Sequence, residues 1–155
     1  MNTIHGRGWG LLAAMVLIVW LIPSQSQTAP GSPACQGSTI DLQGEEVAEK
    51  SRAFLAKLQN AVSQDNKAEV ASMVSYPLLV IHANKKAHIR TEAQFVSRYE
   101  SIFDEHVRSA IAKQSSQCLF GNYQGTMIGG GEIWYREQPN GKMKVVTVNP
   151  TAGRQ

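Results

Sequence analysis

The sequence lacks most of the patterns that indicate a particular chemistry or partner. Its net charge is only +3 and its longest basic run is the pair Lys85-Lys86, so neither favours binding to nucleic acid. No Gly-x-Ser-x-Gly motif occurs. The longest apolar run, residues 11–22, is shorter than the about 20 residues that a membrane-spanning helix needs. We therefore expect no nucleic-acid partner and no serine-hydrolase site.

The first 26 residues have the features of a secretory signal. His5 and Arg7 give a weakly positive start, the apolar run follows, and Pro23 ends it just before Ser24 and Ser26, small residues of the kind that a signal peptidase recognises. We expect cleavage and a periplasmic or secreted protein. The alternative is an uncleaved segment that anchors the chain in the membrane.

Two cysteines, Cys35 and Cys118, are present, and both follow the signal segment. Because disulfides persist in exported proteins, we predict that these two pair. Closing so long a loop would contribute about 4 kcal/mol in the chain-entropy model. The alternative is two thiols that are free or paired elsewhere. Lipid attachment at Cys35 is not favoured. Residues 32–34 lack the apolar residue that a lipid-attachment box carries, and Cys35 lies 13 residues past the apolar run.

Apolar periodicity and turn residues predict a single α+β domain. A long helix is expected over residues 45–64, and a short helix after residue 66 that runs to residue 73. A pair of strands follows at 76–84 and 87–90. Helices at 92–103 and 106–113 follow. Asn66, Thr91 and Asp104 are the expected caps of the second, third and fourth helices. The predicted divisions are a signal peptide at 1–26, a linker at 27–44, the domain at 45–150 and a tail at 151–155.

Residues 119–149 are predicted to form three strands joined by two tight turns. The Asn140-Gly141 pair predicts a two-residue hairpin turn, which fixes the register of the last two strands. A slip of one residue would exchange the two faces of the sheet. The predicted pairs are Glu137–Lys144, Tyr135–Val146 and Ile133–Val148 on one face, and Arg136–Val145 and Trp134–Thr147 on the other.

The element order and the run GTMIGGGEIWY, residues 125–135, resemble the nuclear transport factor 2-like superfamily, and in particular its exported bacterial members. The resemblance implies an order of α-α-β-β-α-α-β-β-β, with a curved antiparallel sheet wrapped as a cone around the N-terminal helices. A pocket then lies between the concave face and the helices. The superfamily includes isomerases, dehydratases, polyketide cyclases and binding or dimerisation modules, so the fold alone does not give the function.

The sequence departs from the enzymatic members that are similar to ketosteroid isomerase, which use carboxylic acids and a tyrosine inside the cone. The strand at 76–84 carries no acid, and the last strands carry only Glu132 and Glu137. We therefore expect no catalytic residues and no cofactor. Gly129-Gly130-Gly131 precedes a strand rather than a helix, so it predicts a turn and not a phosphate loop.

Two groups of residues are the candidate sites. Tyr99, Gln124, Thr126 and Tyr135 are expected to line a pocket for a small apolar ligand, unless they fill the core. Met127, Trp134, Val145 and Thr147 are expected on the outer face of the sheet, where they would join two copies of the chain, unless a terminal segment covers them.

No metal site is expected. His82 and His88 flank the Lys85-Lys86 pair, where we expect the turn, but a two-residue turn would point them to opposite faces and no third ligand lies nearby in the sequence.

Three functions are compatible with these observations. The first is an exported, non-enzymatic binding or interaction module, dimeric through the sheet. The second is a small isomerase-like or cyclase-like enzyme that uses a buried His82 or Glu132. The third is an envelope protein that inhibits or escorts another protein.

Overall fold

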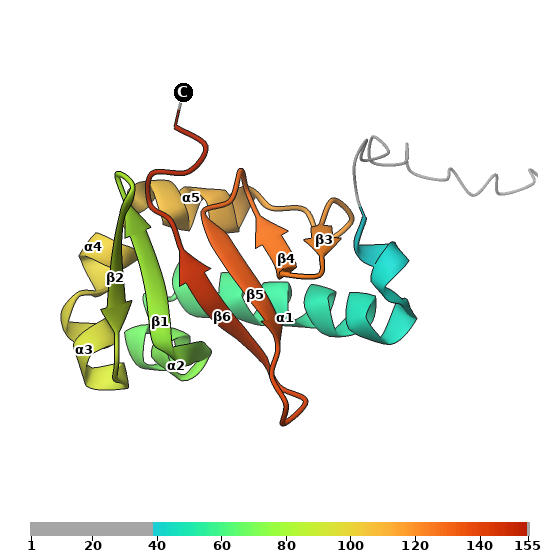
Figure 1. The fold of residues 1–155 in the computed structure, drawn as a ribbon, viewed down its shortest axis with the longest axis horizontal. Coiled ribbons are helices and arrows are strands. Elements are labelled where there is room, and N and C mark those ends of the chain that lie inside the picture. The colour runs from blue at the N-terminus through green and yellow to red at the C-terminus, as the bar shows by residue number, and fades with distance from the viewer. Residues whose placement is uncertain (1–38, 155) are drawn as a thin grey trace, which may run out of the picture. The chain divides into compact units, whose positions relative to one another are not determined.

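The computed structural model describes residues 39–154, which form an α+β domain. A six-stranded mixed sheet is covered on one face by helices, and none of the helices in residues 39–154 lies on the other face (Figure 1). The predicted signal segment and most of the predicted linker lie outside the described residues. The helices are η1 (Ile40–Gln43), α1 (Glu45–Ser63), α2 (Lys67–Ser72), α3 (Glu92–Ser97), α4 (Tyr99–Ile102) and α5 (Glu105–Lys113). The strands are β1 (Val74–His82), β2 (Lys85–Ile89), β3 (Phe120–Asn122), β4 (Gly125–Ile128), β5 (Ile133–Glu137) and β6 (Met143–Val148).

The strands lie in the order β2-β1-β6-β5-β4-β3. The sheet was predicted to be antiparallel, but β1 and β6 run parallel, while the other neighbouring pairs are antiparallel. These two strands lie side by side although β2, the helices α3–α5 and the strands β3–β5 separate them in the sequence. This crossover brings the two halves of the domain together along β1 and β6, which share a large contact.

Three predicted helix starts are confirmed by their caps. The side chains of Asn66, Thr91 and Asp104 each accept a hydrogen bond from the backbone N–H three residues later. The helix predicted over 92–103 is instead two short helices, because the backbone leaves helical geometry at Arg98 (φ −113°, ψ 12°). The break turns α4 so that Tyr99 points into the core.

The turn between β1 and β2 differs from the prediction. Ala83 and Asn84 form it with positive φ angles of 46° and 64°, and His82 pairs directly with Lys85. Asparagine tolerates this left-handed conformation better than most residues. Lys85 and Lys86 therefore belong to an edge strand, where exposed lysines discourage pairing with another sheet.

The last part of the domain has four strands rather than the predicted three. The Asn122 side chain accepts a hydrogen bond from the backbone of Gln124, which is a typical turn stabilised by asparagine. That turn separates the short β3 from β4. The edge of β3 is covered, because Thr39 bonds to the backbone of both Leu119 and Gly121.

The Asn140-Gly141 pair predicts a two-residue turn between β5 and β6, but the turn has three residues, 139–141. A two-residue turn would need the backbone N–H of Pro139, which proline lacks. The hydrogen bond to the Lys142 carbonyl is donated by Gln138 instead, at 2.8 Å, and Gly141 closes the turn with a φ of 75°. The predicted pairs of Glu137, Arg136 and Tyr135 are consequently wrong, and Glu137 lies opposite Met143.

An irregularity in β6 restores the register further along the strand. Tyr135 pairs with Val145 but Trp134 pairs with Thr147, so Val146 is the extra residue. The predicted pairs Trp134–Thr147 and Ile133–Val148 are therefore confirmed. Val145, predicted on the outer face, instead points inward and is fully buried.

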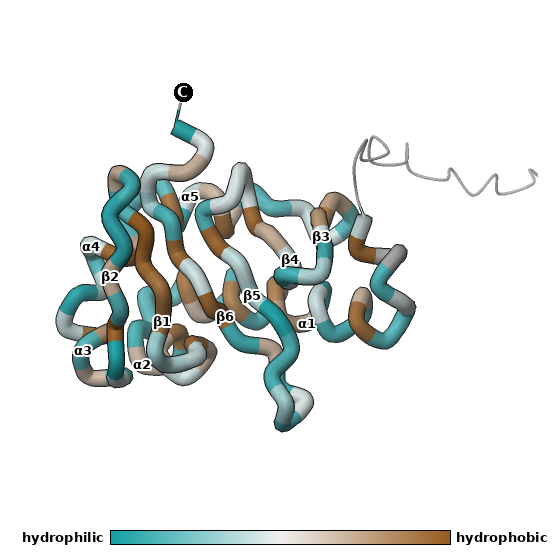
Figure 2. Tube along the Cα trace, in the orientation of Figure 1, coloured by the Kyte–Doolittle hydropathy of each residue, from teal (hydrophilic) through white to brown (hydrophobic). Residues whose placement is uncertain are grey.

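The core lies between α1 and the inner face of the sheet. One stripe of α1 supplies Phe54, Leu55 and Leu58, and the central strands supply buried branched residues. Residues 78–81 of β1 are apolar on both faces of the sheet, and Figure 2 shows a continuous brown stretch in this strand. On the outer face, no helix of the described residues covers these side chains.

We predict that Gly141→Ala destabilises the domain by about 1 kcal/mol. The added Cβ meets only an ordinary contact at 3.7 Å, so the cost comes from the positive φ angle. Urea unfolding of the variant measures the loss. Gly141→Asn is the matched control and should cost less, because asparagine tolerates this conformation. Equal stability of the Ala variant and the parent would contradict the turn described above.

Candidate functional site

A row of hydroxyl groups crosses the interface between α1 and the sheet. Thr126 and Tyr135 are direct neighbours on β4 and β5, as predicted, and are 1% and 0% exposed. The Ser51 and Thr126 hydroxyls lie 3.1 Å apart, and the Tyr135 hydroxyl donates to the Ser51 carbonyl at 3.1 Å. Burial raises the pKa of the Tyr135 hydroxyl well above its usual value. These groups satisfy one another, so none is left to orient a ligand.

Tyr99 lies apart from this row, within a cluster of aromatic rings. Its ring stacks on Phe103 at a centroid distance of 5.4 Å and meets the edge of Phe95 at 5.8 Å. The residue is 1% exposed, and burial raises the pKa of its hydroxyl to about 12. No hydrogen-bond partner for this hydroxyl is present within residues 39–154.

The fourth predicted pocket residue, Gln124, is not part of the interior. It is exposed in the turn between β3 and β4 and faces a groove on the outer side of the sheet. The structure thus brings Thr126 and Tyr135 together, buries Tyr99 elsewhere and leaves Gln124 outside. The three buried members pack in the core, and none of them lines a cleft described below.

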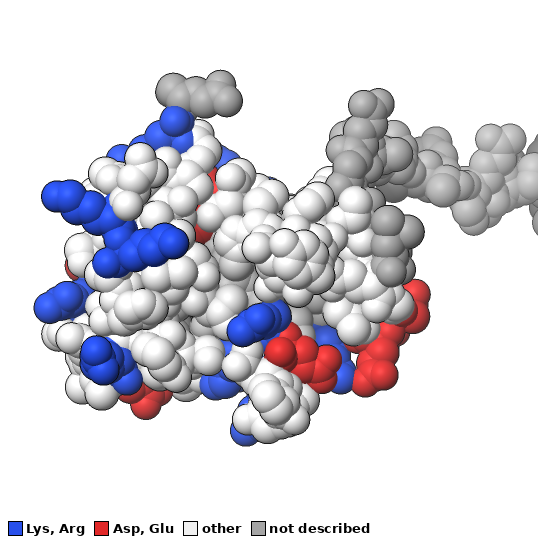
Figure 3. All heavy atoms as spheres, in the orientation of Figure 1, with Lys and Arg blue, Asp and Glu red and all other residues white. Residues whose placement is uncertain are grey.

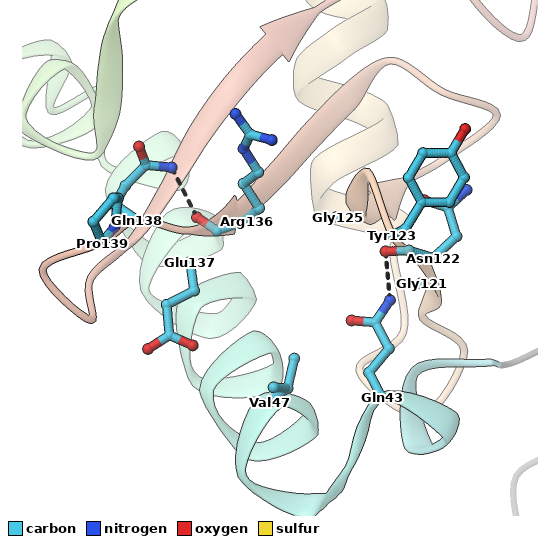
Figure 4. Close-up of a pocket in the computed structure, with 10 residues that line it drawn as sticks. All are labelled: Gln43, Val47, Gly121, Asn122, Tyr123, Gly125, Arg136, Glu137, Gln138 and Pro139. Carbon is cyan, nitrogen blue, oxygen red and sulfur yellow. Dashed lines mark hydrogen bonds between the residues drawn. The ribbon is translucent and has the colours of Figure 1, made fainter.

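An open cleft of about 910 Å³ lies where the start of α1 meets the ends of β4 and β5. Figure 4 shows the Gln43 amide bonded across it to the backbone of Asn122, with Arg136 and Glu137 pointing to opposite sides of β5. Val47 forms part of its floor. The other lining residues are uncharged, so the cleft has one cation and one carboxylate.

The carboxylate of this cleft is already paired. Lys50 lies 2.7 Å from Glu137 and 2.7 Å from Glu46, so its ammonium bridges two acids. Hydrogen bonds to Glu137 and Glu46 raise the pKa of Lys50. Glu137 therefore contributes to fastening α1 to the sheet, and the cleft offers no unpaired acid for catalysis.

A histidine and an acid lie together at the opposite end of β5, and the histidine, His106, was not among the predicted site residues. His106 Nε2 lies 3.0 Å from Glu132 Oε1 and 2.8 Å from the carbonyl of Ala152. The Glu132 side chain is only 5% exposed, and its Oε2 atom has no hydrogen-bond partner among the described residues. Both residues line a cleft of about 430 Å³ between α5 and the Gly129 turn. The one feature of the sequence that indicated this site was Glu132, an acid at the start of a predicted strand, because the predicted strands contain few acids.

The histidines near the first hairpin do not form a site. His88 lies opposite Leu79 and His82 opposite Lys85, so the two rings belong to opposite faces of the hairpin. Both residues are exposed. Across residues 39–154 no group of three or more metal-ligating side chains occurs.

The outer face of the sheet carries one continuous row of half-buried side chains. Strand register aligns Leu79, Thr147, Trp134 and Met127 across four strands. Phe120 extends the row on β3, where its ring meets that of Trp134 edge to face at 6.3 Å. Three of the four predicted outer residues thus lie together, and Val146 takes the place predicted for Val145. A groove of about 480 Å³ runs along this face.

The predicted disulfide is half outside the described part of the chain. Cys118 is half-buried in the loop before β3, whereas Cys35 lies outside the described residues. Thr39, four residues after Cys35, donates its backbone N–H to the carbonyl of Leu119, next to Cys118. The chain thus passes close enough for the pairing, which stays a prediction.

The chain matches no protein-family model, no curated protein and no solved structure. Between residues 39 and 154, none of the helices combines the length and the apolar character that crossing a membrane requires.

We predict opposite effects of removing the two buried tyrosine hydroxyls. Tyr135→Phe should destabilise the domain by about 1 kcal/mol, because it deletes a satisfied buried hydrogen bond. Tyr99→Phe should leave stability unchanged or raise it, because that hydroxyl has no partner in the described structure. Urea unfolding of both variants measures the difference, and a larger loss for Tyr99→Phe would contradict this assignment.

Proposed function

We propose that this protein is an exported, non-enzymatic interaction module that pairs with a second copy through the outer face of its sheet. The observation that carries the proposal is the outer row itself. Aromatic and apolar side chains, including Trp134 and Met127, lie on a face that no described helix covers. Trp, Tyr and Arg are the residue types that contribute most to protein interfaces, and Tyr123, 93% exposed, and Arg136 lie beside the same groove.

The distribution of charge favours a second copy as the occupant. Figure 3 shows a largely uncharged centre over β1, β6 and β5. Lys and Arg gather on the side of β2, and a smaller set of Asp and Glu lies on the opposite side, near the start of α1, with some Lys and Arg beside it. If two copies face each other with opposite ends aligned, the basic side of one meets the acidic side of the other. One two-fold arrangement thus buries the apolar row and pairs both rims.

The same proposal includes a nuclear transport factor 2-like fold. The mixed sheet, its helices on one face and the parallel contact between β1 and β6 are compatible with the cone that the sequence resemblance implies. Export through a cleaved signal at residues 1–26 is part of the proposal as well. The filled interior supports binding at the surface rather than inside the cone.

A second candidate function is a small enzyme that uses Glu132. His82, the other residue that we considered for this role, is exposed, but Glu132 is buried and held by His106. A buried acid in a cleft is a typical acid–base group.

We predict that the protein purified after expression of the full chain forms dimers. Trp134→Ala should raise the dissociation constant about tenfold, because it removes the central aromatic side chain of the row. Raising the salt from about 0.05 M to about 0.5 M should also weaken the dimer, because exposed charges are screened. Sedimentation velocity over a range of concentrations measures both effects.

Val96→Ala is the matched control, since Val96 is 40% exposed on α3, away from this face of the sheet. It should leave the dissociation constant unchanged. A monomer at high micromolar concentration, or equal weakening by both variants, would contradict the proposed interface.

The disulfide makes a separate prediction. Peptide mapping of the purified protein without reductant should recover a Cys35–Cys118 linked peptide. Adding reductant should lower the free energy of unfolding by about 4 kcal/mol, if loop entropy dominates. Two freely alkylated cysteines in protein recovered from the exporting compartment would contradict the pairing.

A further inference from the structure

The cleft beside Glu132 contains a buried carboxylate oxygen that the described protein does not satisfy. One oxygen, Oε1, lies 3.0 Å from His106 Nε2. The other, Oε2, is buried and has no partner within residues 39–154. A buried charged acceptor without a donor is costly, so the few that occur in folded proteins call for an explanation.

The local backbone makes room for this carboxylate. A Cβ atom at Gly129 would collide with Oε2, and one at Gly153 would lie 2.5 Å from Oε1. Both glycines have positive φ angles, 66° and 64°. The Glu132 carboxylate therefore lies between two glycines, with Oε2 beside Gly129 and Oε1 beside Gly153.

The unpaired oxygen faces the side of the cleft. The space beside Gly129 is bounded by Oε2 and by the methyl group of Ala110, and Gly129, Ala110 and Glu132 all line the 430 Å³ cleft. Gly153, which lies beside Oε1, does not line this cleft, whereas His106, which pairs with Oε1, does. Glu132 is thus one of the groups that a ligand between α5 and the Gly129 turn meets.

The histidine supplies a donor to one carboxylate oxygen only. His106 Nε2 faces two acceptors, the Glu132 carboxylate and the Ala152 carbonyl at 2.8 Å, so this nitrogen carries the proton. Oε2 is left without a donor among the described residues. A cationic N–H group is the donor that bonds a carboxylate most strongly. A cleft of 430 Å³ lies within the size range of small-molecule sites.

A second lining residue has the opposite charge. Lys113, in the last turn of α5, lines the same cleft, is exposed, and makes no ion pair with another described residue. A ligand that carries an ammonium group for Glu132 and a carboxylate for Lys113 matches both ends. We propose that this cleft binds a small zwitterion with a primary ammonium and a carboxylate, the chemical class of free amino acids.

The test compares three small molecules against the ¹⁵N-labelled protein purified after expression of the full chain. L-Alanine carries both groups, ethylamine only the ammonium and propionate only the carboxylate. We expect L-alanine to shift the amide signals of Gly129, Glu132 and Ser109, and ethylamine to shift the same signals with an affinity about fivefold weaker. Propionate should shift none of them. No shift with L-alanine or ethylamine at about 50 mM, far above the Kd expected of a fragment-sized ligand, would overturn the proposal.

Two variants distinguish the anchors. Glu132→Gln should abolish the L-alanine shifts, while Lys113→Ala should make L-alanine and ethylamine bind equally. Because Glu132→Gln sits in a buried position, its folding is verified from the rest of the amide spectrum. Glu45→Gln, an exposed acid at the start of α1, is the matched control and should change nothing. If the folded Glu132→Gln variant shows the same L-alanine shifts as the parent, the assignment of Glu132 is wrong. If the Lys113→Ala variant still binds L-alanine more tightly than ethylamine, the assignment of Lys113 is wrong.

Discussion

The packing of α1 against the inner face of the sheet is the contact on which the rest of the domain depends. The Phe54 ring lies 4.8 Å from that of Tyr135, and the Ser51 hydroxyl reaches Thr126 on the next strand. Polar groups in this position are stable only because each finds a partner inside the interface. The interface between α1 and the sheet is thus filled by buried side chains. The surfaces that we consider for binding are the outer face, the cleft at the start of α1 and the cleft beside Glu132.

These surfaces differ in what they can do. The cleft at the start of α1 has one acid, and Lys50 already pairs with it. The outer face carries an apolar and aromatic row, which suits contact with another protein. The Glu132 cleft has a buried carboxylate oxygen that lacks a partner among the described residues. This distribution is the basis of the two proposals, a second copy on the outer face and a small ligand beside Glu132.

Local sequence signals predicted most of the elements, because caps and periodicity act over a few residues. Asn66, Thr91 and Asp104 begin helices as their side chains predict. The β5–β6 register shows where such reasoning is insufficient. Asn140-Gly141 indicated a two-residue turn, but the missing N–H of Pro139 moved the hydrogen bond to Gln138. Val146 is an extra residue in β6, which no turn rule predicts. Beyond it, Trp134 and Ile133 have their predicted partners again, and Val145 lies on the inner face of the sheet in place of Val146.

The site residues were predicted less well, because they depend on contacts between distant parts of the chain. Alternation along strands correctly placed Thr126 beside Tyr135, but it did not reveal that Ser51 would satisfy both. His106 and Glu132 lie on different elements, and only the folding of α5 against the β4–β5 turn brings them together. No local pattern carries that information.

The central claim is that the outer face, rather than the interior, is the main contact surface. The fluorescence of Trp134 tests it directly, in a chain whose Trp9 and Trp20 are replaced by Phe so that one tryptophan remains. The account predicts that the emission maximum shifts to shorter wavelength as protein concentration rises, because the half-exposed indole becomes buried between two copies. An emission maximum that stays constant from nanomolar to high micromolar concentration would contradict it.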